Sequence, residues 1–194
     1  MKPQSIRIIQ EEHGTIAAIA KSLGMMIERG PRDDLAGYFE VVSAMLFYID
    51  EFPERLHHPK ETELLFPKVA LRDPETAELI ARLDKEHAQG ESAIRELQYL
   101  LKAWELLGPT RREAFEVATK RHLQFYMAHM RVEEAVILPA ALKVLDAQDW
   151  KEIDAAFVSN IDPLNGKYPR DPIYDHLFTR IVTRAPAPIG LGEQ

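Results

Sequence analysis

The feature that most constrains this chain is an apolar repeat with steps of three and four residues that includes histidines. A spacing of this kind places side chains on one face of an α-helix, whereas no convincing run alternates with the period of a β-strand. The first repeat consists of Ile6, Ile9, His13, Ile16, Ala20, Leu23 and Ile27. Similar repeats follow later in the chain, so the sequence predicts an all-α fold.

Turn residues divide the repeat into four long helices. Gly30-Pro31 ends the first helix and Gly108-Pro109 ends the third, because glycine and proline interrupt a helix. Asp73-Pro74 is a typical start for the third helix, and residues 110–113 (Thr-Arg-Arg-Glu) have the form of a capping box for the fourth. Four long amphipathic helices with short connections predict an antiparallel up-and-down four-helix bundle.

The second helix is the least regular of the four. Asp33 or Asp34 can cap its start. Pro53 and Pro59 each remove a backbone donor and clash with the turn before them, so we expect a bend or a restart between them. We expect Pro67 to mark the end of this helix.

The chain divides into a bundle domain, residues 1–161, and a C-terminal tail, residues 162–194. The bundle domain includes a short fifth helix, roughly residues 149–161. The tail contains five of the 13 prolines and a segment, residues 173–178, that fits an amphipathic helix. We expect the tail to pack on the bundle or on a second subunit, so that a homodimer is compatible with the sequence.

Composition limits the chemistry that the chain can support. It has no cysteine, which excludes disulfides, thiolate metal sites, iron–sulfur clusters and cysteine nucleophiles. A metal site must therefore use His, Asp and Glu, ligands that suit zinc, iron or manganese. A formal net charge of -7 gives no support to nucleic-acid binding. Without a long apolar run, we expect a soluble, cytoplasmic protein with no membrane contact.

Histidine and glutamate recur together at positions that the apolar repeats predict to be buried. Three histidines have a glutamate four residues later, on three different helices, and the first helix adds another histidine. Residues four apart share a helix face, so both can reach one metal or two adjacent metals. Buried charges are expensive unless they are paired or bind a metal. The candidate ligands are His13, His57, Glu61, His87, Glu91, His129 and Glu133. Seven ligands exceed what one tetrahedral zinc needs and suit two iron ions.

Some positions leave alternatives open. His57 projects about 20° from Leu46 around the helix and His58 about 120°, which favours His57 as the ligand. His58 then orients the site or faces solvent. His13 and His57 are also predicted to lie at different heights in the bundle. Counted from the turn that joins the first two helices, His57 lies about 9 Å farther along its helix than His13 does along its own. Either the second helix starts later, or its proline-containing stretch is irregular.

We expect the other polar residues near these positions not to be the main metal ligands. Glu134 is the rival of Glu133. His122 lies one heptad before His129, which suggests a supporting or polar core role more than a ligand. Charged residues expected to face solvent are Glu12, Glu63 and Glu86.

The whole pattern resembles the hemerythrin-like family, also called the HHE cation-binding domain, over about residues 5–147. The matching segments are residues 11–13 (Glu-Glu-His), 57–61 (His-His-Pro-Lys-Glu) followed by 65–67 (Leu-Phe-Pro), His87 with Glu91, and 129–134 (His-Met-Arg-Val-Glu-Glu). The resemblance implies a four-helix bundle that holds a non-heme di-iron centre. By position, Glu61 and Glu133 would bridge the two iron ions, and His13, His57, His87 and His129 would be terminal ligands.

One departure from the family pattern concerns oxygen. The oxygen-carrying hemerythrins have a histidine four residues after the third-helix ligand, where this chain has Glu91. A more carboxylate-rich site stabilises ferric iron, so this departure speaks against reversible oxygen carriage. The resemblance still implies a protein that binds or reacts with oxygen, peroxide or nitric oxide in sensing, stress response or iron handling. Whether it is an enzyme stays open.

Two other functions compete with this hypothesis. A ferritin-like di-iron oxidase would need two Glu-x-x-His motifs, and only residues 54–57 match here. The other alternative is a helical protein-interaction module whose metal site is structural or absent.

Overall fold

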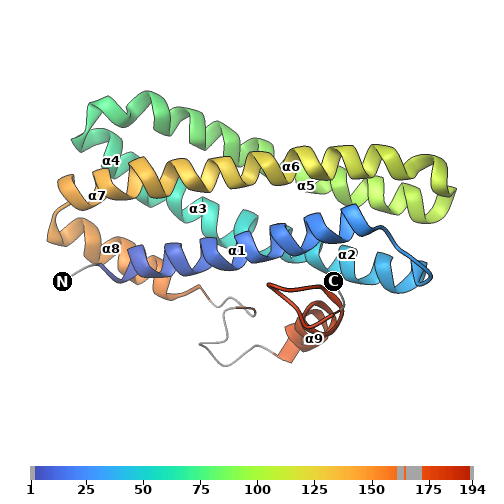
Figure 1. Cartoon of the computed structure of the whole chain (residues 1–194). Coiled ribbons are helices and arrows are strands. Elements are labelled where there is room, and N and C mark those ends of the chain that lie inside the picture. Colours follow the sequence, from blue (N-terminus) through green and yellow to red (C-terminus); the bar gives the residue numbers. More distant parts are fainter. Residues whose placement is uncertain (1–2, 161–163, 165–171, 193–194) are drawn as a thin grey trace.

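The computed structural model describes residues 3–160, 164 and 172–192. Every regular element among these residues is helical, apart from an isolated bridge between Pro186 and Gly192. The all-α prediction is therefore confirmed. Four long helical stretches lie side by side (Figure 1), and two shorter helices pack against them.

The four stretches include several short elements in addition to their main helices. The first stretch is α1 (Gln4–Arg29). The elements of the second are α2 (Leu35–Ile49), η1 (Asp50–His57), α3 (His58–Lys60), η2 (Glu61–Leu65) and α4 (Phe66–Arg72). The third comprises η3 (Pro74–Thr76) and α5 (Ala77–Leu107). The fourth comprises η4 (Pro109–Arg111), α6 (Arg112–Val132), η5 (Glu133–Ile137) and α7 (Leu138–Val144).

Most of the predicted helix ends are observed. Gly30 and Gly108 end α1 and α5 with φ of 70° and 90°, a left-handed conformation that glycine adopts without strain. Asp34 caps α2, because its side chain accepts a hydrogen bond from the Gly37 backbone N–H at 2.8 Å. The capping box expected at residues 110–113 was wrong. A 3-10 turn, in which Arg111 N–H donates to the Gly108 carbonyl, leads into α6 instead.

The second stretch stays helical through Pro53 and Pro59, where a bend or a restart was expected, and it passes the end expected at Pro67. It continues to Arg72. Two of its segments, η1 and η2, are π-helical, and Pro53 lies inside η1. A π-helix bonds each N–H to a carbonyl five residues back, so it accommodates extra residues in a turn. Helix α2 starts directly after Asp34, so of the two explanations offered for the height of His57, the irregular proline-containing stretch is the one observed.

Two apolar clusters enclose the middle of the molecule from its two ends. One cluster joins the C-terminal half of α1 to α2, α5, α6 and α9, with Leu23 and Met45 at its centre. The other joins the N-terminal half of α1 to α4, α5, α7 and α8, around Ile9 and Ile137. The buried histidines and glutamates lie between these clusters. The site is therefore held by the interior of the fold, and among the described residues no long loop contributes to it.

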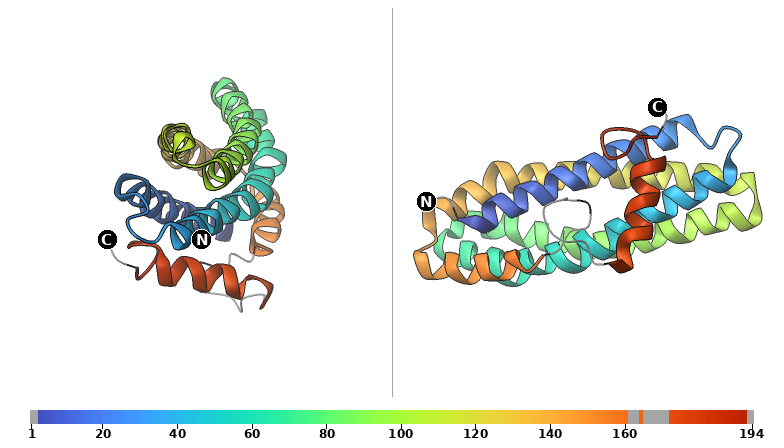
Figure 2. Two further views of the ribbon diagram at one scale, coloured as in Figure 1. Left: turned by 90° about the vertical axis from the view of Figure 1, so that its right-hand side faces the viewer. Right: turned by 90° about the horizontal axis from the view of Figure 1, so that it is seen from below.

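The two shorter helices pack on the outside of the four stretches (Figure 2). Helix α8 (Ala147–Val158) contacts α1, and Asp146 starts it with a capping box that includes Asp149. Helix α9 (Asp175–Arg184) contacts α2, with Ile181 buried. The predicted domain boundary at residue 161 lies outside the described residues.

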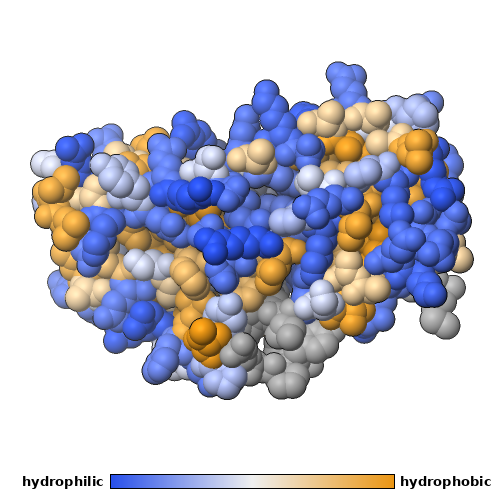
Figure 3. All heavy atoms as spheres, turned by 180° about the vertical axis from the view of Figure 1, so that it is seen from behind, coloured by the Kyte–Doolittle hydropathy of each residue, from blue (hydrophilic) through white to orange (hydrophobic). Residues whose placement is uncertain are grey.

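The surface of the molecule seen from behind carries many polar side chains (Figure 3). On the face shown in Figure 3, hydrophilic residues are abundant and apolar residues form separate groups between them. None of the described helices is long and apolar enough to cross a membrane.

Candidate metal centre

Four histidines meet in two pairs at the centre of the molecule. The Nε2 atoms of His13 and His57 lie 3.1 Å apart, and those of His87 and His129 lie 2.9 Å apart. Each histidine comes from a different helical stretch, and none is more than 7% exposed. The four stretches therefore converge on one buried, nitrogen-rich site.

Two fully buried carboxylates lie between the pairs. Glu133 places Oε2 3.5 Å from His13 Nε2 and Oε1 3.0 Å from His129 Nε2, so its two oxygens face different pairs. Glu61 Oε2 is 3.3 Å from His57 Nε2 and 3.7 Å from His87 Nε2. No hydrogen-bond partner for any of these four carboxylate oxygens occurs among the described residues. Such orphaned buried charge is costly without a cation.

The outward-facing nitrogen of each of these imidazoles has its own hydrogen-bond partner. Around the first pair, His13 Nδ1 contacts Glu134 at 3.1 Å and His57 Nδ1 donates to Glu12 at 2.7 Å. In the second pair, His129 Nδ1 contacts the Glu86 carboxylate at 2.9 Å, and His87 Nδ1 contacts the Thr62 hydroxyl at 2.9 Å. A hydrogen on Nδ1 leaves the Nε2 lone pair free to bind a metal, which is the usual arrangement around metal-ligating histidines.

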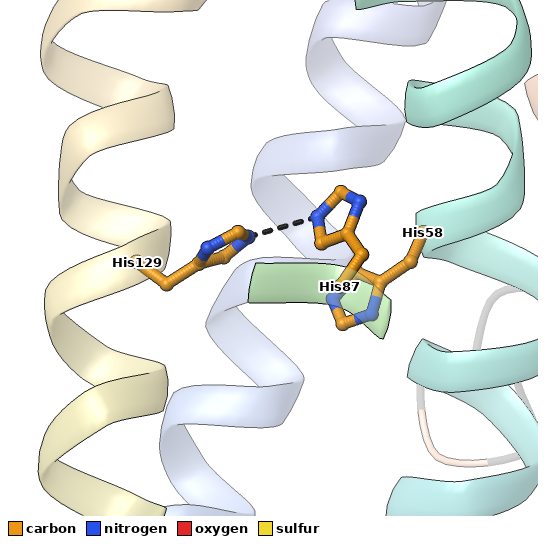
Figure 4. Close-up of side chains that lie close together, drawn as sticks. All are labelled: His58, His87 and His129. Carbon is orange, nitrogen blue, oxygen red and sulfur yellow. Dashed lines mark hydrogen bonds between the residues drawn. The ribbon is translucent and has the colours of Figure 1, made fainter. Parts of the chain in front are cut away.

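A fifth imidazole, from His58, lies beside the second pair, His87 and His129. Its ring stacks on that of His87 with centroids 4.1 Å apart, and it lies 5.7 Å from the His129 ring (Figure 4). Its Nδ1 donates to Glu54 at 3.0 Å, and its Nε2 is 3.2 Å from the Tyr126 hydroxyl. His58, His87 and His129 can thus bring three ligand atoms within 4.8 Å of one another.

The spacing of the nitrogens fits a metal. Two nitrogens bound to one ion at about 2.1 Å, with their bonds at a right angle, lie about 3.0 Å apart. The two observed Nε2 separations, 3.1 and 2.9 Å, are of this size. With their hydrogens on Nδ1, the paired Nε2 lone pairs would repel one another unless a proton or a metal lay between them. The donor set therefore fits cations at both pairs.

A family model decides what kind of domain this is. The model for the hemerythrin HHE cation-binding domain matches residues 4–141, which include all the residues described above. The chain belongs to the hemerythrin HHE family. A search of curated proteins found no match to this chain. The resemblance expected from the sequence is thus confirmed, and the matched residues include groups of histidine and glutamate that could hold a metal ion.

Six of the seven expected ligands come together, and Glu91 does not. In this hemerythrin HHE domain Glu91 is half exposed and pairs with Arg95. The buried face of α5 runs through Leu83, His87 and Gly90, so position 91 turns toward solvent. The absence of a side chain at Gly90 leaves room for Glu54 of the second stretch, whose carboxylate oxygens would lie 3.0 and 3.1 Å from a Cβ there.

Three glutamates lie where the sequence did not place them, and one of the two places considered for His58 is excluded. Glu12 was expected in solvent but is buried, and it also accepts a hydrogen bond from Asn160 at 2.9 Å. Glu86 was also expected in solvent, yet it reaches His129 from the neighbouring helix. Glu54 had been considered only as part of a ferritin-like motif. A solvent-facing His58 is excluded by its burial. The contacts of Glu12 and Glu86 cross between helices, so no periodicity along one helix reveals them. Glu54 and His58 are four residues apart on one stretch, a spacing that could have paired them.

Other expectations agree with the structure. Glu63 is exposed. Glu133 is the buried member of its pair, while Glu134 is 43% exposed and contacts only the outer edge of His13. His122 belongs to none of the metal-competent groups among the described residues. It packs against Tyr126 with ring centroids 5.4 Å apart, and burial lowers its pKa to about 4.

Protons on the buried histidines supply part of the positive charge that a metal would otherwise provide beside the carboxylates. Burial lowers the pKa of His57, but the Glu61 and Glu12 carboxylates outweigh it and raise that pKa well above its usual range. Burial also lowers the pKa of His129, but Glu133 outweighs it and raises that pKa to about 9. Burial raises the pKa of Glu133, but His129 and His87 lower it well below its usual range. The site therefore stabilises positive charge.

Proposed function

We propose that this protein is a non-heme di-iron protein that binds or reacts with a small ligand such as oxygen, peroxide or nitric oxide. One observation carries the proposal: four orphaned carboxylate oxygens lie between two pairs of imidazoles whose Nε2 atoms converge. Membership of a cation-binding family supports it. Imidazole and carboxylate ligands without thiolate suit iron.

The donors divide between two metal positions. His13 and His57 would hold the first metal, and His58, His87 and His129 the second. Glu61 and Glu133 would bridge the two, because each contacts a histidine of both pairs. The four long stretches would form the antiparallel bundle typical of such centres.

The part played by His58 changes the argument about oxygen. The case against reversible oxygen carriage depended on Glu91 as a ligand, and Glu91 lies at the surface. With His58 in its place the second position has three imidazoles. The donor set therefore gives no reason to exclude reversible binding, and the choice between binding and reaction belongs to experiment.

When bound, an iron pair supplies a Lewis-acidic, redox-active centre for a small ligand. The chain itself orients the imidazoles through the outer carboxylates. It also excludes bulk water, because apolar clusters cover both ends of the site. Under these conditions a small ligand can bind at the metals while bulk water is excluded.

The test is elemental analysis of the purified chain after reconstitution with ferrous iron. We expect about two irons per chain, as in other carboxylate-bridged sites in helix bundles. The matched pair of variants is Glu133→Gln, which should lose iron, and Glu91→Gln, which should retain it. Absence of metal from the wild-type chain would refute the proposal and favour a helical interaction module. Two zinc or manganese ions would preserve the site but refute the iron chemistry.

A further inference from the structure

Tyr126 carries a buried hydroxyl that the proposed metal ligands do not use. It lies on α6 one turn before His129, and only 4% of it is exposed. Ile16 and Met130 form an apolar cluster with its ring. Its hydroxyl is 3.2 Å from His58 Nε2. The phenol thus places one polar atom beside the second metal position.

The hydrogen-bond directions at His58 determine what this hydroxyl does. Since His58 Nδ1 donates to Glu54, Nε2 carries the lone pair, and the Tyr126 hydroxyl is the donor to it. This nitrogen is also the atom through which His58 would bind a metal. One lone pair cannot serve both. Binding of a metal at Nε2 would therefore release the phenol O–H within the site.

A released, buried O–H needs a new acceptor, because an unpaired donor is costly away from water. One candidate is an external ligand at the second metal position. The other is Glu54, whose carboxylate also hydrogen-bonds to the Tyr126 hydroxyl. Glu54 already accepts from His58 through Oε2, so the phenol shares this acceptor with His58. An external ligand at the metal position offers the phenol an acceptor that it does not share with His58.

We propose that Tyr126 is a specificity-determining residue that donates a hydrogen bond to a small anionic ligand at the position lined by His58, His87 and His129. Ligands with an accessible lone pair on their outer atom, such as azide or peroxide, are favoured over ligands without one. The inference rests on the proposed function, because it requires a metal at this position.

The experiment measures azide binding by the iron-loaded, oxidised full-length protein, followed by its visible absorption. The variant Tyr126→Phe removes only the hydroxyl, and we expect it to weaken azide binding about tenfold, as loss of a hydrogen bond to a charged group does. The matched control is Tyr38→Phe. Tyr38 is equally buried, but it packs on Trp104 and its hydroxyl has no partner among the described residues. We expect its azide affinity to equal that of the wild type.

A second measurement observes the hydrogen bond directly. The infrared stretch of bound azide should shift between H2O and D2O in the wild type and in Tyr38→Phe. In Tyr126→Phe this isotope shift should vanish. Iron content is determined on every sample, so that ligand affinity is compared at equal loading.

The outcomes separate the two proposals. A wild-type chain without iron overturns both the proposed function and the role of Tyr126. Iron-loaded wild type that does not bind azide overturns the role of Tyr126 alone, and so does equal azide affinity in wild type and Tyr126→Phe, which would show that the phenol turns to Glu54. Loss of iron from Tyr126→Phe also overturns it, because the phenol would then support the metal instead of the ligand.

Discussion

Metal binding should stabilise this fold in a way that depends on particular histidines. The two proposed metal positions lie between the two apolar clusters, and their residues come from all four long stretches. Unfolding separates the ligands, so a metal bound to the native site stabilises the folded state. The variant His129→Ala removes one ligand from the second position, while His122→Ala removes an equally buried histidine one heptad away.

The size of the effect follows from the number of positions. A metal present at 100 times its dissociation constant stabilises the folded state by about 2.7 kcal/mol per site, so two sites contribute about 5 kcal/mol. For a chain of this length each kcal/mol changes the melting temperature by about 2–4 °C. We therefore expect iron to raise the melting temperature by about 10–20 °C in the wild type, and by about half of that or less in His129→Ala.

Calorimetry of chelated and reconstituted samples measures this rise. His122→Ala is the control, because it should lower the melting temperature of both forms while the rise between them stays as in the wild type. An equal loss of the rise in both variants would show that general core damage, not ligand loss, is being measured. An unchanged melting temperature after complete removal of bound iron would falsify the idea of a core metal centre.

Three further predictions follow from the same site. Glu133→Gln should weaken iron binding at least 100-fold because it removes a shared ligand, whereas Glu91→Gln should change it less than twofold; equilibrium titration against a chelator measures both. Gly90→Ala should lower iron affinity about tenfold, because a Cβ at 3.0 Å from Glu54 displaces the carboxylate that orients His58; unchanged affinity would mean that Glu54 moves without consequence. Iron affinity should rise with pH from about 7 to about 9, because the pKa of His129 is about 9 and its proton must leave before metal binds, and the rise should level off above that pH.

The same pKa determines how pH acts on the metal-free protein. A histidine whose pKa is raised in the folded state contributes stability that is fully present below the unfolded pKa of about 6.5 and lost as pH rises through the folded value. The chelated protein should therefore become less stable between pH 6.5 and 9, while the iron-loaded protein should not. Denaturant titrations at the two pH values compare the free energies of unfolding.

The sequence by itself determined the helices and most of the residues that meet at the candidate metal centre. The three-and-four spacing and the residues at turns such as Gly30 and Gly108 act locally, within one helix. The same local rule placed His13, His57, His87 and His129 on buried faces, together with Glu61 and Glu133. Position 91 misled this reasoning, because a four-residue spacing from His87 is compatible with a shared face but does not decide which neighbour faces the core.

Only the tertiary structure decided which side chains of one helix contact the site residues of another. Glu12 reaches His57 and Glu86 reaches His129 across helix boundaries, and Glu54 fills the space that Gly90 leaves on another helix. The π-helical segment around Pro53 ends at His57, and both His57 and His58 are buried. Such contacts depend on the relative height and rotation of packed helices. Packing fixes these quantities, and the spacing of residues along one chain does not encode them.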